Sequence, residues 1–172
     1  EAACTTLTGP EEVRRLTLAV LEESAASGVV YSECFLSPDF CGGRDLGAWR
    51  EYLHAIEEAA AEAEKTMGIT LRGIVTPIRH FGPDKAREAA RCAAETAGRF
   101  IVGFGIGGDE KVGALKDFAW SFDCAREAGL RIQHAGQLAQ ALLQGQRRAL
   151  DAGEHIGETA LGVEGIARPR QR

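Results

Sequence analysis

Four short apolar segments, each followed by a longer helical pattern, constrain the fold of this 172-residue chain more than any other feature. The expected strands begin near residues 29, 69, 100 and 130 and are rich in apolar residues, many of them β-branched. Between them, apolar residues recur at intervals of three or four, as on one face of a helix. Strands that alternate with helices in this way form a parallel sheet with right-handed crossovers. We therefore predict an α/β fold.

Glycine, proline and acidic residues mark where these elements begin and end. The pattern predicts strands over about 29–35, 69–76, 100–108 and 130–134, and helices over about 10–27, 46–67, 83–97, 114–128 and 138–152. A fifth strand is a candidate near His155-Ile156-Gly157. Four or five βα units are fewer than the eight that close a barrel. Two architectures therefore stay open, an open doubly wound sheet and a part of a larger barrel.

Composition narrows the class of partner. The formal net charge is −5, whereas nucleic acids and anionic membranes require a basic surface. No apolar run approaches the roughly 20 residues of a membrane span, and the first residues lack the basic and apolar regions of a signal peptide. The five cysteines are scattered, with no C-x-x-C spacing, which is typical of reduced thiols. We expect a cytoplasmic protein whose residues 1–172 form a single domain.

The glycines Gly103, Gly105, Gly107 and Gly108, which end the third expected strand, raise the alternative of a dinucleotide-binding loop. The fingerprint of such loops is G-x-G-x-x-G opening directly into a helix. The spacing differs here, and Asp109-Glu110 would place two negative charges beside a pyrophosphate. A better explanation is that these glycines let a ligand approach the backbone closely.

Ordered motifs lie at all four expected strand ends. They are Tyr31-x-Glu33-x-x-x-Ser37-Pro38, Gly73-Ile74-Val75-x-x-Ile78-Arg79-His80, Val102-Gly103 through Gly107-Gly108-Asp109-Glu110, and His134-Ala135-Gly136. Together they resemble the adenosine deaminase family of zinc-dependent amidohydrolase barrels, especially its bacterial members. The similarity is strongest over residues 9–136, and residues 137–172 diverge. It implies a (β/α)8 TIM-barrel fold, of which this chain would form an incomplete, central portion of about four to five βα units.

The resemblance also implies a reaction and the residues that perform it. The family deaminates adenosine or a related 6-aminopurine by hydrolysis, giving the 6-oxo purine and ammonia. By resemblance His134 is a ligand of zinc (Zn2+), and the backbone amide of Gly108 meets a purine ring nitrogen. Zinc lowers the pKa of bound water towards 7. The family's proton shuttle is a glutamate at the position that Gln137 occupies here.

Several departures from the family pattern keep a second function open. Gln137 cannot deliver and recover a proton, and losing general acid–base help typically costs ~10²–10⁴ in rate. No H-x-H pair occurs in the sequence, and His155 is only a loose candidate for a further ligand, while His54 is expected on an exposed helix face and His80 in a hydrogen-bonding loop. The alternative is a non-catalytic purine-binding or interaction module. Because an incomplete barrel has two unpaired sheet edges, the missing strands would come from a longer chain or from another copy in a homo-oligomer.

Overall fold

The structure is a computed structural model that describes residues 7–109 and 111–133. Within these residues helices and strands alternate as the sequence predicts. They are, in order, α1 (Pro10–Ala26), β1 (Tyr31–Leu36), α2 (Leu46–Met67), β2 (Thr70–Val75), the 3-10 turn η2 (Arg79–Phe81), α3 (Pro83–Glu95), β3 (Ile101–Phe104), the 3-10 turn η3 (Leu115–Phe118), α4 (Ala119–Glu127) and β4 (Arg131–Ile132). The helix expected at 138–152 and the candidate fifth strand lie outside the described residues.

The strands form one parallel sheet in the order β1-β2-β3-β4. Leu36 at the end of β1 pairs with Val75 at the end of β2, so these two strands finish at the same edge. The register shifts between Gly73 and Ile74, where β2 meets β3. The parallel α/β prediction is therefore confirmed over the described residues.

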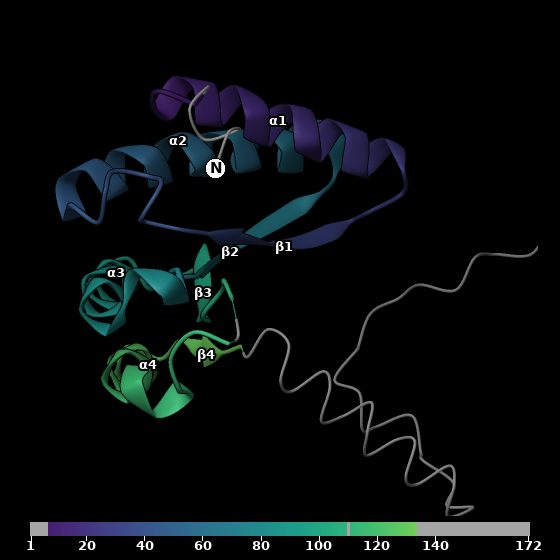
Figure 1. The fold of residues 1–172 in the computed structure, drawn as a ribbon. Coiled ribbons are helices and arrows are strands. Elements are labelled where there is room, and N and C mark those ends of the chain that lie inside the picture. The colour runs from purple at the N-terminus through teal and green to yellow at the C-terminus, as the bar shows by residue number, and fades with distance from the viewer. Residues whose placement is uncertain (1–6, 110, 134–172) are drawn as a thin grey trace, which may run out of the picture. The chain divides into compact units, whose positions relative to one another are not determined.

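The helices cover the sheet in two pairs (Figure 1). In the first pair α1 packs on α2, which contacts β2, and in the second pair α3 and α4 lie beside β3 and β4. The predicted inner face of α2 is confirmed, because Trp49, Leu53, Ile56 and Ala60 are all buried. Trp49 is fully buried and its indole N–H donates to the Thr96 hydroxyl at 3.1 Å, which joins α2 to the end of α3.

The opposite face of β1 is not covered by the other described elements. Tyr31 and Phe35 point away from the core and are 49% and 56% exposed. Between them on the same face lies Glu33, which reaches the last strand of the sheet, since its carboxylate accepts a hydrogen bond from the Gln133 amide at 3.1 Å. Neighbouring strands lie about 4.8 Å apart, so a contact between the first and fourth strands requires a curved sheet. The open face is therefore the concave one.

Two predicted elements differ from the structure. The third strand ends at Phe104 and not at residue 108, because residues 105–109 leave the strand as an irregular loop. The helix predicted over 114–128 begins with the 3-10 turn η3, in which the Asp117 carboxylate accepts from the Ala114 amide at 2.9 Å. This local bond favours a tight turn before the regular helix begins.

The described cysteines Cys34, Cys92 and Cys124 are free thiols, as the sequence predicts. Burial, followed by the nearby Asp45 and Asp39 carboxylates, raises the pKa of the Cys92 thiol to about 11. Among the described residues, the helices are too short or too polar to cross a lipid bilayer.

Candidate active site at the carboxyl ends of the strands

The loops that follow β1, β2 and β3 are joined by backbone hydrogen bonds that continue past the strands. The Thr76 amide donates to the Leu36 carbonyl at 2.8 Å, and the Gly105 amide donates to the Val75 carbonyl at 2.9 Å. At the next strand the Gln133 amide donates to the Phe104 carbonyl at 2.8 Å. The carboxyl ends of all four strands therefore meet at one edge, which is where barrels of this architecture place their chemistry.

Gly108 lies at this edge and is exposed. The loop before it is fixed to the loop after β2, because the Gly107 amide donates to the Pro77 carbonyl at 3.0 Å and the Arg79 amide donates to the Gly107 carbonyl at 2.8 Å. Gly108 has a φ of +100°, and a Cβ at this position would lie 3.1 Å from Nδ1 of His80. Backbone conformation and space therefore both require glycine.

The other glycines of this loop make room for neighbouring strands. A Cβ on Gly105 would lie 2.9 Å from the Gln133 carbonyl oxygen, and one on Gly103 would lie 3.3 Å from the Arg131 carbonyl oxygen. At Gly107 the nearest atom is the Thr76 methyl carbon at 3.1 Å. We predicted that these glycines let a ligand approach the backbone closely. At these three positions the atoms that approach belong to the protein's own chain.

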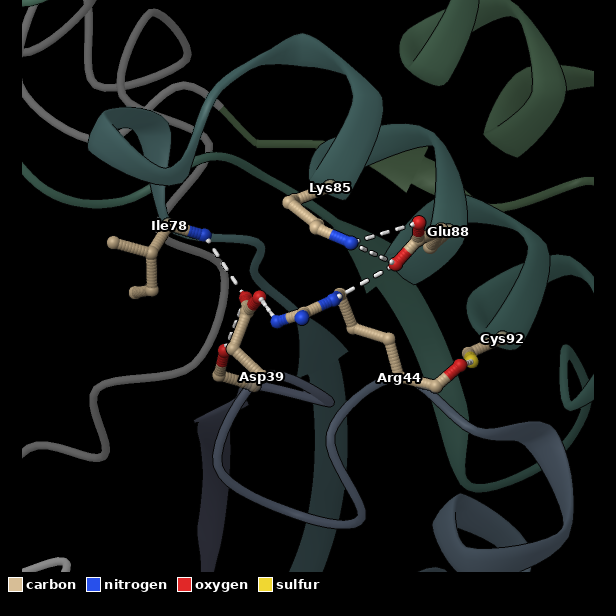
Figure 2. Close-up of polar contacts among 7 residues, drawn as sticks. Asp39, Arg44, Ile78, Lys85, Glu88 and Cys92 are labelled. Carbon is tan, nitrogen blue, oxygen red and sulfur yellow. Dashed lines mark hydrogen bonds and ion pairs between the residues drawn. The ribbon is translucent and has the colours of Figure 1, made fainter.

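Asp39, in the loop after β1, carries a carboxylate whose contacts reach the loop after β2 (Figure 2). Its side chain is 0% exposed and pairs with Arg44 at 2.6 Å. The same carboxylate accepts from the Ser37 hydroxyl at 3.0 Å and from the Ile78 backbone amide at 3.2 Å. The last bond crosses from the loop after β1 to the loop after β2.

Arg44 continues this network outwards to α3, as Figure 2 shows. Its Nε donates to the Glu88 carboxylate at 2.9 Å, and Lys85 contacts both oxygens of Glu88 at 3.1 and 3.2 Å. The hydrogen bond to Asp39 raises the pKa of Arg44. Hydrogen bonds from Lys85 and then from Arg44 lower the pKa of Glu88. Negative and positive side chains therefore alternate from the loop after β1 to α3, and each is paired with a neighbour of opposite charge.

A second polar group lies on the concave face, beside the position where the chain leaves β4. Besides the Gln133 amide, the Glu33 carboxylate accepts from Arg131 at 3.0 Å and from the Tyr31 hydroxyl at 2.8 Å. Gln133 immediately precedes His134 in the sequence. The group therefore fixes the last described residue before the predicted ligand.

Of the three predicted site residues, the structure describes Gly108 alone. His134 and Gln137 lie outside the described residues, as does His155. His54 is exposed near Glu58, as expected, with Nε2 at 3.6 Å from the carboxylate, and the exposed His80 packs its ring on Phe81 with 4.8 Å between centroids. Within residues 7–109 and 111–133, metal-binding side chains do not gather in a group of three or more.

Two described hollows lie at the amino ends of the strands, away from this edge. One of about 440 Å³ is found at the amino ends of β3 and β4, lined by residues that include Gly98, Ile101 and Arg131. Parallel α/β barrels bind substrates at the opposite, carboxyl ends. We therefore assign the candidate site to the edge that carries Gly108 and not to this hollow.

Comparison with known proteins places the chain in a family. The family model described as adenosine deaminase matches residues 1–156. The chain belongs to the adenosine deaminase family. An adenine deaminase from Chelativorans sp. (strain BNC1) is 41% identical over 162 residues, which cover 92% of this chain and 48% of that protein. The chain thus spans about half the length of the curated relatives it matches.

Solved structures of this family have the same fold. The chain superimposes on a zinc-bound amidohydrolase from Burkholderia ambifaria with a TM-score of 0.66 and 26% identity, covering 74% of this chain and 35% of that one. An adenine deaminase from Arthrobacter aurescens gives a TM-score of 0.65 at 26% identity, with coverages of 83% and 43%. The four parallel strands are therefore an incomplete TIM barrel of the amidohydrolase type, and not an open doubly wound sheet.

Two charged residues of this adenosine deaminase family member were not predicted as part of the site. Asp39 and Arg44 appear in the sequence only as polar residues of a loop between Ser37-Pro38 and α2. Arg44 has a φ of +72°, which is unusual for a residue other than glycine. No pattern in the sequence indicates that such a residue turns back to pair with a buried aspartate.

Proposed function

We propose that this chain forms part of a site that deaminates a 6-aminopurine by hydrolysis, releasing the 6-oxo purine and ammonia. The observation that carries the proposal is the match to an adenine deaminase over 92% of the chain. Adenine is the first substrate to test, since the first relatives are named for it. Adenosine and deoxyadenosine are the related aminopurines to compare with it.

Gly108 is the described residue that we assign to the purine. It is exposed at the carboxyl edge of the sheet, and its loop is fixed by paired backbone bonds on the β2 side. A backbone amide held in this way is preorganised to donate to a ring nitrogen, because its orientation does not depend on a flexible side chain. We propose that it orients the ring so that the amine-bearing carbon faces the end of β4.

We propose zinc as the metal and His134 as one of its ligands. The zinc-bound amidohydrolase from Burkholderia ambifaria supports this choice of metal. When bound, zinc lowers the pKa of coordinated water towards 7. The described residues do not form a metal site by themselves, so the remaining ligands are to be sought outside them.

Gln137 motivates the alternative function, a purine-binding module without catalysis. Its amide can hydrogen-bond to a purine but cannot exchange a proton near neutral pH. If this alternative holds, the protein binds purines and releases no ammonia from them.

An ammonia-release assay on the full-length protein, with zinc added, tests the two functions. We expect measurable release from adenine and an increase of ~10²–10⁴ in kcat for Gln137→Glu, which restores general acid–base catalysis. Gln137→Asn is the matched control, because it keeps the amide and is expected to stay at or below the parent rate.

Metal analysis of the same samples separates the outcomes. About one equivalent of zinc together with ammonia release supports deamination. If parent and Gln137→Glu are folded and bind hypoxanthine, yet neither holds zinc nor releases ammonia, deamination is overturned and the binding module is supported.

A further inference from the structure

We propose that Asp39 is a positioning residue that holds the Gly108 loop in the conformation that receives the purine. The inference rests on the proposed function and adds to it a residue that does not itself touch substrate. Asp39 acts through Ile78, the residue that joins the loops after β1, β2 and β3.

Asp39 is hydrogen-bonded directly to the loop after β2. The Ile78 amide donates to Oδ2 of Asp39 at 3.2 Å, and the same oxygen is held from the other side by the Ser37 hydroxyl at 3.0 Å. Ile78 and Asp39 lie 39 positions apart in the sequence, so this is a tertiary contact and not a local turn. Figure 2 shows the carboxylate between the Ile78 amide and the Arg44 guanidinium.

Ile78 is in turn bonded to the loop that carries Gly108. Ile78 forms an isolated parallel bridge with Gly107, made by the bonds from the Gly107 amide to the Pro77 carbonyl and from the Arg79 amide to the Gly107 carbonyl. A Cβ on Gly108 would meet the Arg79 amide nitrogen at 3.4 Å and the Ile78 methyl carbon at 3.5 Å, so the two loops are in close contact. A displacement of Ile78 therefore displaces Gly108.

The negative charge of Asp39 strengthens its bond to Ile78. A buried carboxylate is costly unless it is paired and hydrogen-bonded, and Asp39 satisfies this condition with Arg44, Ser37 and Ile78. An ionised acceptor makes a stronger hydrogen bond to a backbone amide than a neutral one does. The charge of Asp39 thus stiffens the bond to Ile78, whereas a neutral side chain of the same shape would loosen it.

Asp39→Asn in the full-length protein tests the inference by two measurements. We expect amide exchange in the segment 105–109 to accelerate about tenfold, because a hydrogen bond to a charged group is worth more than a neutral one. We also expect the Kd for hypoxanthine, a purine that carries no amine to lose, to rise about tenfold while kcat on adenine changes less than KM. Ser37→Ala, which removes one support of Oδ2, should shift both in the same direction by less.

Two controls separate positioning from general destabilisation. Glu88→Gln weakens the outer end of the network and leaves the contacts of Asp39 in place, so exchange at 105–109 should stay at the parent rate. Leu53→Ala destabilises the core of α2 and should accelerate exchange without a preference for 105–109. A folded Asp39→Asn or Ser37→Ala protein with parent exchange at 105–109 overturns the inference. If exchange at 105–109 is faster in Asp39→Asn but the parent protein binds no purine, the contact between Asp39 and the loop is supported. The proposed function is then overturned.

Discussion

At the scale of single residues, the glycines after β3 differ in what they make possible. Gly103 and Gly105 give space to the backbone of β4, whereas Gly108 needs its positive φ and lies against His80. The sequence indicates that glycines end the strand, but it does not distinguish those that serve packing from the one that serves a site. That distinction depends on which chain lies opposite each Cα.

Gly108→Ala should lower both stability and purine affinity. The positive φ costs an alanine about 1–2 kcal/mol, and the added methyl group meets His80 Nδ1 at 3.1 Å. Gly28→Ala is the matched control, because Gly28 has a φ of +85° and nothing within 4 Å of its Cβ position. In urea unfolding, we expect Gly108→Ala to lose more free energy of unfolding than Gly28→Ala. Only Gly108→Ala should weaken hypoxanthine binding, and equal binding by both variants would contradict the assignment of Gly108.

Cys92 should make stability depend on alkaline pH. Its pKa is raised from 9.0 in an exposed thiol to about 11 in the fold, first by burial and then by the Asp45 and Asp39 carboxylates. Below pH 9 the thiol is protonated in both the folded and the unfolded state, and its contribution to the free energy of unfolding is fully present. As the pH rises from 9 to about 11, the unfolded state ionises first and that contribution is lost.

The size of this loss follows from the shift. Each pKa unit corresponds to about 1.4 kcal/mol, so the free energy of unfolding should fall by at most about 3 kcal/mol between these pH values. Cys92→Ala removes the titration, and the difference in unfolding free energy between parent and variant isolates it from other groups. A difference that is constant from pH 8 to pH 11 would show that Cys92 does not contribute.

At the scale of elements, the contact between β1 and β4 decides the curvature of the sheet. Glu33 in β1 and Gln133, the residue directly after β4, are 100 positions apart, yet their side chains meet at 3.1 Å. Apart from the side-chain contacts of Glu33 with Arg131 and Gln133, the described strands pair with their immediate neighbours. The polar group around Glu33 thus joins the two ends of the sheet across its concave face.

A double-mutant cycle on Glu33→Ala and Gln133→Ala should give a coupling of about 1 kcal/mol in the free energy of unfolding. The cycle of Glu33→Ala with Arg131→Ala is the comparison, because Arg131 is 67% exposed and its ion pair is open to solvent. Exposed pairs contribute about 0–1 kcal/mol. A larger coupling for Arg131 than for Gln133 would show that charge, and not the amide bond, links the strands.

Most element boundaries could be predicted from the sequence. Apolar spacing and the aspartate and glycine at its ends place α2 at Leu46–Met67, as observed. In contrast, β3 ends earlier than its apolar run suggests, and η3 replaces the first turn of the predicted helix. These differences depend on contacts with other strands and on the Asp117 carboxylate. The spacing of apolar residues carries no information about either.

At the scale of the whole molecule, the family could be predicted from the sequence, but the contacts that support the candidate edge of the sheet could not. Four motifs at strand ends identify the barrel, and the matches to family members confirm it. The bond from the Ile78 amide to Asp39 and the bond from Gln133 to Glu33 join segments 39 and 100 positions apart in the sequence. Such pairs depend on how the sheet curves, which a single sequence does not specify.

The order β1-β2-β3-β4 has a consequence for how the chain acquires its structure. Every strand adds beside the one made just before it, so each new βα unit finds its partner already in place as synthesis proceeds. The crossovers between consecutive strands span 25 to 33 residues, and closing them costs less entropy than pairing strands that lie farther apart along the chain. The Glu33–Gln133 contact forms last, because it requires all four strands. The sheet is thus suited to growth from one end while the ribosome is still at work.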